Sequence, residues 1–137
     1  MRDESYWTRQ LMDYLRTKHK DWLAYKLADH FTSGIPDVVI MAFGNTFWFE
    51  LKVLRPGENM SDRIRKDALQ FHDMCKIEEI GCPAWYLVFL PGDTMQYLAV
   101  RPSYIKDSVR QLAGTPLLTV HRNFKWVTLL VETEHEH

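Results

Sequence analysis

The spacing of apolar residues changes from a helical period near the N-terminus to strand-like runs further along the chain. Apolar residues at i, i+4, i+7 and i+8 predict an amphipathic helix over residues 4–18. They are Trp7, Leu11, Tyr14 and Leu15. Runs rich in β-branched and aromatic residues then predict strands at 22–28, 36–43 and 46–52. The Gly44-Asn45 dipeptide between the last two runs predicts a two-residue hairpin turn.

The second half of the chain predicts a helix between two strands, followed by shorter elements. Ser61 is a candidate N-cap for a helix that extends to about residue 80 and ends at Gly81. The continuous apolar run 83–90 predicts a buried strand. A strand, a helix and a strand in this order indicate a right-handed crossover and parallel pairing. The remaining expected elements are a strand at 95–100, a helix at 103–112, and a second hairpin at 117–131 that turns near Arg122-Asn123.

The first predicted hairpin separates an apolar face from a charged one. With Gly44-Asn45 as the turn, Asp37 is expected opposite Lys52, at roughly 5 Å between Cβ atoms, and diagonal to Glu50, at roughly 7–8 Å. Because side chains alternate along a strand, these three charges share one end of one face. Two carboxylates so placed can share a divalent cation. The opposite face is apolar: Val38, Ile40, Ala42, Phe47, Phe49, Leu51 and Val53.

Two interpretations of the charged face are open from periodicity alone. Lys52 could neutralise two acids on a solvent-facing sheet, since cross-strand ion pairs are common. Alternatively the charges are buried for a purpose, because an unpaired buried charge costs several kcal/mol. The residues just before Asp37 favour the second interpretation. Pro36 fixes the backbone there, and Gly34 allows another backbone or a phosphate to approach closely.

Composition indicates one globular domain over residues 1–137. Hydrophobic residues make up 46% of the chain and charged residues 26%, which argues against disorder. The net charge of −1 does not indicate a nucleic-acid partner, so such binding would need a local basic patch. Cys75 and Cys82 show no CxxC spacing, which is typical of a reduced protein. The sequence has neither a signal-peptide pattern nor a membrane-spanning run, and we expect a cytoplasmic protein that does not bind a membrane.

The charged residues of the hairpin also carry a resemblance to a known superfamily. Pro36-Asp37, followed thirteen residues after the aspartate by Glu50-Leu51-Lys52, resembles the PD-(D/E)XK nuclease motif. The resemblance implies a metal-dependent hydrolase of phosphodiester bonds.

A fuller pattern is similar to the VRR-NUC nucleases, including short stand-alone forms from phages. It consists of GIPD at 34–37, FELK at 49–52, and a helix that bears Gln70 and ends at Gly81. The resemblance covers roughly residues 1–100. It implies an α/β fold with a restriction-endonuclease-like αβββαβ core, in which helices flank a central mixed sheet. Residues 101–137, with the predicted C-terminal β-hairpin, form an accessory segment outside the pattern.

The resemblance also implies roles for the motif residues. Asp37, Glu50 and the backbone carbonyl of Leu51 would bind the catalytic Mg²⁺, with Mn²⁺ as a substitute. All of these ligands are hard oxygen donors, which suit those ions. Lys52 would orient the attacking water or stabilise charge on the phosphate.

Two further catalytic candidates come from helices. Glu4 matches an acidic residue on the first helix of the family, although an acid in a first turn also complements the helix dipole. Gln70 matches the family's helical glutamine, although it also lies on a polar helix face that solvent alone would explain.

A basic segment follows the motif and is the expected landing surface for DNA. Residues 52–66 hold five basic and two acidic side chains, a net charge of +3. Groups of this kind bind backbone phosphates with little base selectivity. The candidate nucleic-acid-binding residues are Arg55, Arg63 and Lys66.

The sequence therefore predicts a Mg²⁺-dependent DNA endonuclease, acting on branched or flapped DNA. The alternative is a catalytically inactive nucleic-acid-binding or assembly module with the same fold. We also expect a homodimer whose interface includes the apolar segment 115–132, although this segment could instead pack on its own core.

Overall fold

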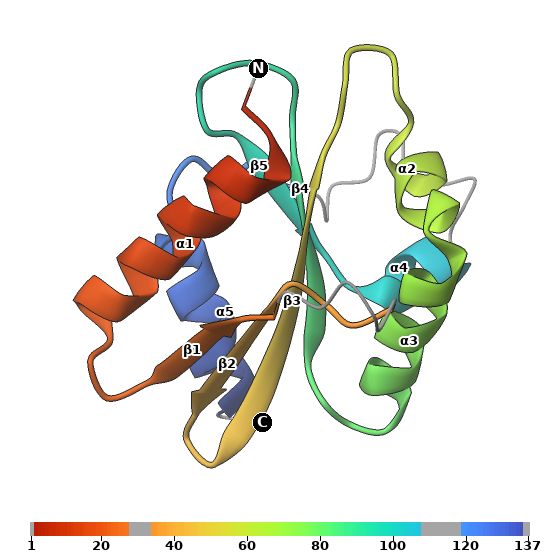
Figure 1. Ribbon diagram of the computed structural model, residues 1–137. Coiled ribbons are helices and arrows are strands. Elements are labelled where there is room, and N and C mark those ends of the chain that lie inside the picture. The colour runs from red at the N-terminus through yellow and green to blue at the C-terminus, as the bar shows by residue number, and fades with distance from the viewer. Residues whose placement is uncertain (1, 28–33, 108–118, 136–137) are drawn as a thin grey trace.

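A five-stranded sheet forms the centre of the protein, with helices on both faces (Figure 1). The computed structural model describes residues 2–27, 34–107 and 119–135. The β3–β4 pair is parallel and the other neighbouring pairs are antiparallel, so the sheet is mixed. In spatial order the strands are β1 (Leu23–Lys26), β2 (Val38–Ala42), β3 (Asn45–Val53), β4 (Ala84–Phe89) and β5 (Tyr97–Val100).

The helices form two layers that enclose two apolar cores. Helices α1 (Glu4–Lys18) and α5 (Lys125–His135) cover one face of the sheet. Helices α2 (Met60–Lys66), α3 (Ala68–Glu79) and α4 (Pro102–Asp107) cover the other. Strand β4 is apolar throughout because alternate residues enter alternate cores. The predicted α/β fold, with an αβββαβ core and a mixed sheet flanked by helices, is confirmed.

Helix α1 has the bounds that its apolar spacing predicts. Asp3 caps it, since its carboxylate accepts a hydrogen bond from the N–H of Tyr6 at 2.8 Å. The stripe of Trp7, Leu11 and Leu15 is buried against the sheet. The packing of this stripe sets the helix so that its first turn lies beside the end of β3 that carries Lys52.

The register of the β2–β3 hairpin differs from the predicted one by two residues. Ala42 pairs with Asn45, so Phe43 and Gly44 form the turn, with φ of 55° and 74°. Positive φ at both central positions is the requirement of a type I′ turn, which matches the twist of the strands. A shift by an even number of residues leaves each side chain on its predicted face. The shifted register places Asp37 opposite Glu50 on the neighbouring strand, and not opposite Lys52.

The helix predicted from Ser61 to residue 80 is two helices, α2 and α3, which meet at Asp67. The N-cap is Asn59, whose side-chain oxygen accepts from the N–H of Asp62 at 3.1 Å, so α2 begins at Met60. Ser61 lies inside the helix and is buried. The end before Gly81 is confirmed: α3 stops at Glu79, and Gly81 has φ of +97°.

The predicted C-terminal hairpin is wrong where the structure describes it. His121 forms a single bridge to Tyr97, and helix α5 follows. Phe124, Val127 and Val131 are buried at helical spacing, and this periodicity outweighs the strand propensity of the valines. Of the predicted 103–112 helix, α4 covers the part up to Asp107. Residues 108–118, which include the start of the predicted hairpin, lie outside the described residues.

None of the helices in the described part of the chain is long and apolar enough to cross a membrane.

Candidate active site

The structure brings Asp37, Glu50 and Lys52 together at the C-terminal end of β3. The backbone N–H of Asp37 donates to Oε1 of Glu50 at 2.9 Å, and Nζ of Lys52 lies 3.4 Å from Oε2 of Glu50. Glu50 is 3% exposed and Lys52 is 4% exposed. Helices α2 to α4 cover this face, so the interpretation of two solvent-facing acids neutralised by Lys52 is wrong.

Burial of this pair disfavours the charged form of both carboxyl groups. Burial, and then the charge of Asp37, raise the pKa of Glu50 to about 8, against the opposing effect of Lys52. Burial also raises the pKa of Asp37, although hydrogen bonds from Glu50 and from the N–H of Leu51 oppose the shift. The pair therefore holds a proton near neutral pH, and a bound cation would displace it.

The backbone beside this pair offers a third oxygen. Continuing the β2–β3 register sets Leu51 opposite Pro36, and proline has no N–H to donate to the Leu51 carbonyl. The N–H groups of Trp48 and Leu54 donate to carbonyls on the β4 side, so the backbone groups of Leu51, an odd number of residues from each along β3, point to the β2 side. Since the N–H and C=O of one strand residue point to the same neighbouring strand, the Leu51 carbonyl points to the side of Asp37.

The donor set fits a hard divalent cation. It comprises two carboxylates and a carbonyl, all of them oxygen ligands suited to Mg²⁺ or Mn²⁺. No group of three or more His, Cys, Asp or Glu side chains in the described ranges could hold a metal. Asp37, Glu50 and the Leu51 carbonyl would supply the protein ligands, and water or phosphate oxygens would complete the coordination.

Asp67 is a site residue that sequence reasoning missed. Its Oδ2 lies 2.5 Å from Nζ of Lys52 and 3.5 Å from Nη1 of Arg63. The hydrogen bond from Lys52 is the main cause of the lowered pKa of Asp67. Aspartate is a poor residue for a helix interior and a good one for a helix start, so its place within the predicted 61–80 helix was a signal of the break.

Glu4 reaches the same end of β3 from helix α1. Its Oε1 accepts from the N–H of Val53 at 3.3 Å and from Nη2 of Arg63 at 2.8 Å. Arg63 thus joins Glu4 to Asp67, and through Asp67 to Lys52. A continuous network of charges connects the first turn of α1, the end of β3 and the α2–α3 junction.

Gln70 lies in the first turn of α3, just after Asp67. Its Oε1 is buried and has no hydrogen-bond partner among the described residues. A buried acceptor without a partner costs on the order of 1–3 kcal/mol. No hydrogen bond within the described part of the chain joins Gln70 to Asp37, Glu50 or Lys52, so a link to the site remains a prediction.

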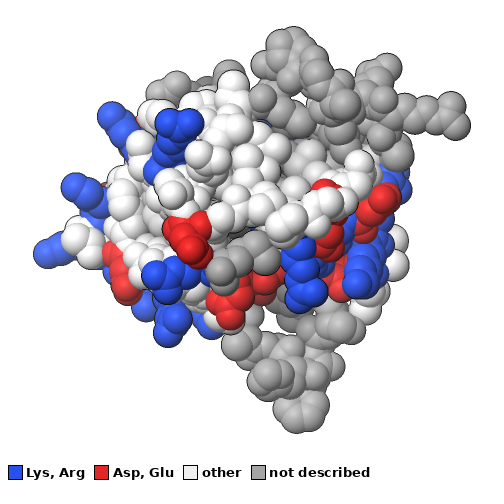
Figure 2. Space-filling model, turned by 90° about the horizontal axis from the view of Figure 1, so that it is seen from above, with Lys and Arg blue, Asp and Glu red and all other residues white. Residues whose placement is uncertain are grey.

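A polar cavity of about 460 Å³ opens beside this network. Arg55 and Lys66 line it with exposed side chains, whereas the Arg63 guanidinium is paired within the protein. Figure 2 views the molecule from above relative to Figure 1. Acidic side chains cross the middle of the face seen there, and basic side chains lie on both sides of them. The full lining is Arg2, Asp3, Glu4, Val53, Arg55, Glu58, Arg63, Lys66 and Asp67.

Comparison with known proteins yields distant structural similarities and no match at the level of sequence families. No protein-family model matches the chain, and no curated protein sequence matches it. The chain is similar to a solved structure of Hjc, a Holliday junction resolvase of the archaeal hyperthermophile Archaeoglobus fulgidus. The TM-score is 0.47 and the sequence identity 17%, over 93% of this chain and 98% of that chain.

Proposed function

We propose that the chain is a divalent-metal-dependent nuclease of the PD-(D/E)XK type that hydrolyses phosphodiester bonds in DNA. The observation that carries this proposal is the convergence of Asp37, Glu50 and Lys52 at one end of β3. Two buried acids with raised pKa values, placed beside a buried lysine, cost folding free energy unless a bound ligand neutralises their charge. A binding module without turnover has no need for acids that would face DNA phosphates.

Each residue of the site has a role in this chemistry. Asp37, Glu50 and the Leu51 carbonyl would hold Mg²⁺, which supplies positive charge to a phosphoryl oxygen and lowers the pKa of bound water. Lys52 donates hydrogen bonds towards the attacking water or the phosphate oxygens. This stabilises the negative charge that grows in the transition state.

Other groups position the site rather than react. Asp67 holds the Lys52 ammonium from the helix side, so that the lysine does not fold onto Glu50 alone. Arg63 and Glu4 tie Asp67 to α1 and to the backbone of Val53. We assign Gln70 to the same environment, because its unpartnered Oε1 suits a water or a nucleotide donor.

DNA would lie across the polar cavity. Arg2, Arg55 and Lys66 are exposed cations there, and Arg55 and Lys66 would bind backbone phosphates on either side of the scissile bond. Arg63 contributes to the same positive surface while it is paired with Glu4. We propose branched or flapped DNA as the substrate and the cytoplasm as the site of action, including the possibility of a phage-encoded enzyme in its host.

A homodimer remains part of the proposal, because two strands or two arms are most simply cut by two sites related by a two-fold axis. Part of the predicted interface segment 115–132 is buried within its own chain. Helix α5 packs Val127, Leu130 and Val131 into the core of its own chain, so these side chains are not available to a second subunit.

The test is a cleavage assay on labelled linear, flapped and four-way DNA with Mg²⁺, Mn²⁺, Ca²⁺ or excess EDTA. Mg²⁺ and Mn²⁺ should support cutting, and Ca²⁺ should permit binding without cutting, since it activates water less well. Cutting that persists in EDTA would exclude the metal mechanism. Tight binding of DNA without cutting under any metal would favour the inactive binding module.

A further inference from the structure

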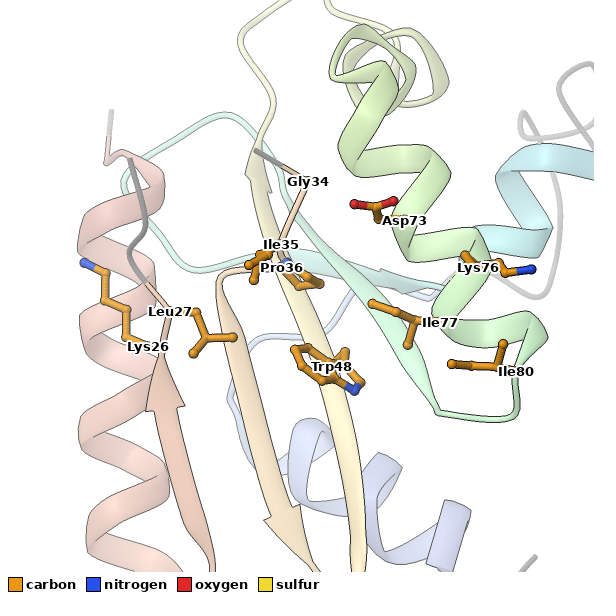
Figure 3. Close-up of a pocket in the computed structure, with 10 residues that line it drawn as sticks. All are labelled: Lys26, Leu27, Gly34, Ile35, Pro36, Trp48, Asp73, Lys76, Ile77 and Ile80. Carbon is orange, nitrogen blue, oxygen red and sulfur yellow. The ribbon is translucent and has the colours of Figure 1, made fainter. Parts of the chain in front are cut away.

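A second, mainly apolar cavity of about 640 Å³ lies next to the proposed metal site (Figure 3). The site described above does not use it. Its wall is continuous with that site, because Gly34, Ile35 and Pro36 lead directly to Asp37, and the N–H of Leu27 donates to the Asp37 carbonyl at 2.7 Å. Any DNA held for cleavage at Asp37 would pass beside this cavity.

The centre of the cavity is Trp48, which lies on β3 two residues before Glu50 and on the same face. Two residues along a strand span roughly 6.6 Å, or about two base steps of DNA. In Figure 3 the indole lies between Leu27 on one side and Ile77 and Ile80 on the other. A flat, half-buried ring with aliphatic side chains across from it is a slot for a second flat ring.

The charges around the cavity suit a nucleotide. Lys26 and Lys76 lie on opposite sides with their ammonium groups directed outward, and neither has an ion-pair partner among the described residues. They are placed to bind the phosphates that flank a base in the slot. Asp73 lines the cavity beside Gly34 and offers a carboxylate acceptor to the amino group of a base.

We propose that this cavity takes one unpaired nucleobase of the DNA substrate, stacked on Trp48 and next to the scissile phosphate. Its volume lies within the range of small-ligand sites, roughly 300–1,000 Å³, and accommodates a base with part of its sugar. The choice of DNA as the ligand rests on the proposed nuclease function. The pocket would direct cutting to positions where a base is unpaired, as at a bulge, a flap or a branch point.

The experiment measures binding without chemistry, by fluorescence anisotropy in EDTA with the full chain. Three labelled DNAs are compared: a paired duplex, the same duplex with one unpaired adenine, and the same with an abasic residue in place of that adenine. The adenine bulge should bind about five- to 150-fold more tightly than the abasic bulge, the range expected for stacking of one base on an aromatic ring. Equal affinities for the two bulges would overturn the proposal.

Variants then locate the effect. Trp48→Leu keeps an apolar side chain but removes the ring, and it should abolish the preference for the adenine bulge. Trp126→Ala is the matched control, because Trp126 stacks on His121 on the opposite side of the sheet and should keep the preference. A Trp48→Leu protein that retains the preference would contradict the role of the ring. A Trp48→Leu protein that keeps the preference for the adenine bulge but changes its oligomeric mass in light scattering would assign the pocket to a protein contact instead.

Failure of this proposal and failure of the nuclease proposal are distinguishable. Cleavage of the same three DNAs with Mg²⁺, at equal affinity for the adenine and abasic bulges, would exclude the base pocket and leave the nuclease standing. Base-dependent affinity in EDTA without any cleavage in Mg²⁺ would support the pocket and count against the enzyme.

Discussion

The Lys52 ammonium lies 2.5 Å from Oδ2 of Asp67, across the junction of α2 and α3, and 3.4 Å from Oε2 of Glu50. The lysine thus stands between an acid on the sheet and an acid on the helices. Lys52 is 4% exposed, and a cation this deeply buried needs such partners. The contact joins the helical layer to the end of β3, and it determines where the amine points.

Asp67→Asn should lower the rate of DNA cleavage about 10- to 100-fold, the usual effect of removing a partner that orients an active-site group. DNA affinity should change little, because Asp67 is an acid and contacts Lys52 instead of phosphate. Asp62→Asn, on the exposed part of α2, is the control and should cut at the wild-type rate. Single-turnover rates and binding constants for the three proteins check the prediction, and an unaltered rate in Asp67→Asn would contradict it.

In excess EDTA, the wild-type protein should lose stability as the pH rises from about 5 to about 8. The folded protein raises the pKa of Glu50 from 4.5 to about 8, so within this window it binds a proton that the unfolded chain releases. The stabilising proton is fully present below pH 4.5 and is lost as the pH approaches the folded pKa. The slope should reach about 1.4 kcal/mol per pH unit.

Glu50→Gln should flatten this dependence and make the metal-free protein more stable than wild type at pH 8. Glu132→Gln, at an exposed position of α5, is the control and should keep the wild-type slope. Urea unfolding followed by circular dichroism between pH 5 and 9 measures both. A Glu50→Gln protein that keeps the wild-type slope would show that the carboxyl pair does not share a proton.

Arg55→Ala and Lys66→Ala should each weaken DNA binding by a similar factor for all sequences. Each lost phosphate contact should lower the slope of log affinity against log salt by roughly 0.9. Lys125→Ala, at the start of α5 on the other side of the molecule, should leave the slope unchanged. A double Arg55 and Lys66 variant with the wild-type salt dependence would place the DNA on another surface.

Gly34→Ala should destabilise the fold more than Gly57→Ala does. Both glycines have positive φ, +102° and +85°, which costs any other residue on the order of 1–2 kcal/mol. At Gly34 a Cβ would also overlap the Asp73 carboxylate, whereas at Gly57 nothing lies within 4 Å. The difference between the two variants should be about 1–3 kcal/mol in urea unfolding. Equal losses would mean that Asp73 moves aside freely.

The charged end of the hairpin was predictable because it depends on alternation and not on register. The turn lies at Phe43-Gly44, two residues away from the pairing predicted with Gly44-Asn45, and an even shift moves no side chain to the other face. Burial of Glu50 and Lys52 was not predictable from the hairpin alone. It depends on α2, α3 and α4, which pack over this face.

Two features of the second half escaped pattern reasoning for different reasons. The run after residue 117 has β-branched residues at strand-like density, yet Phe124, Val127 and Val131 also fit a helical stripe, and packing on the sheet decides for the helix. The break at Asp67 was missed because the residues on either side continue a helical pattern, although an aspartate favours a helix start over a helix interior. Only the contact with Lys52 shows that the break places the Asp67 carboxylate beside the buried ammonium group.

Single-turnover cleavage of a labelled flapped duplex in Mg²⁺ tests the central claim most directly, with wild-type protein compared with Asp37→Asn and Lys52→Met. Asp37→Asn removes one charge from the carboxyl pair while keeping the side-chain size, and Lys52→Met removes the buried ammonium. The account predicts cutting by wild type and no detectable cutting by either variant, with circular dichroism showing that both are folded. Cutting by Asp37→Asn at the wild-type rate would contradict the assignment of this site as the active site.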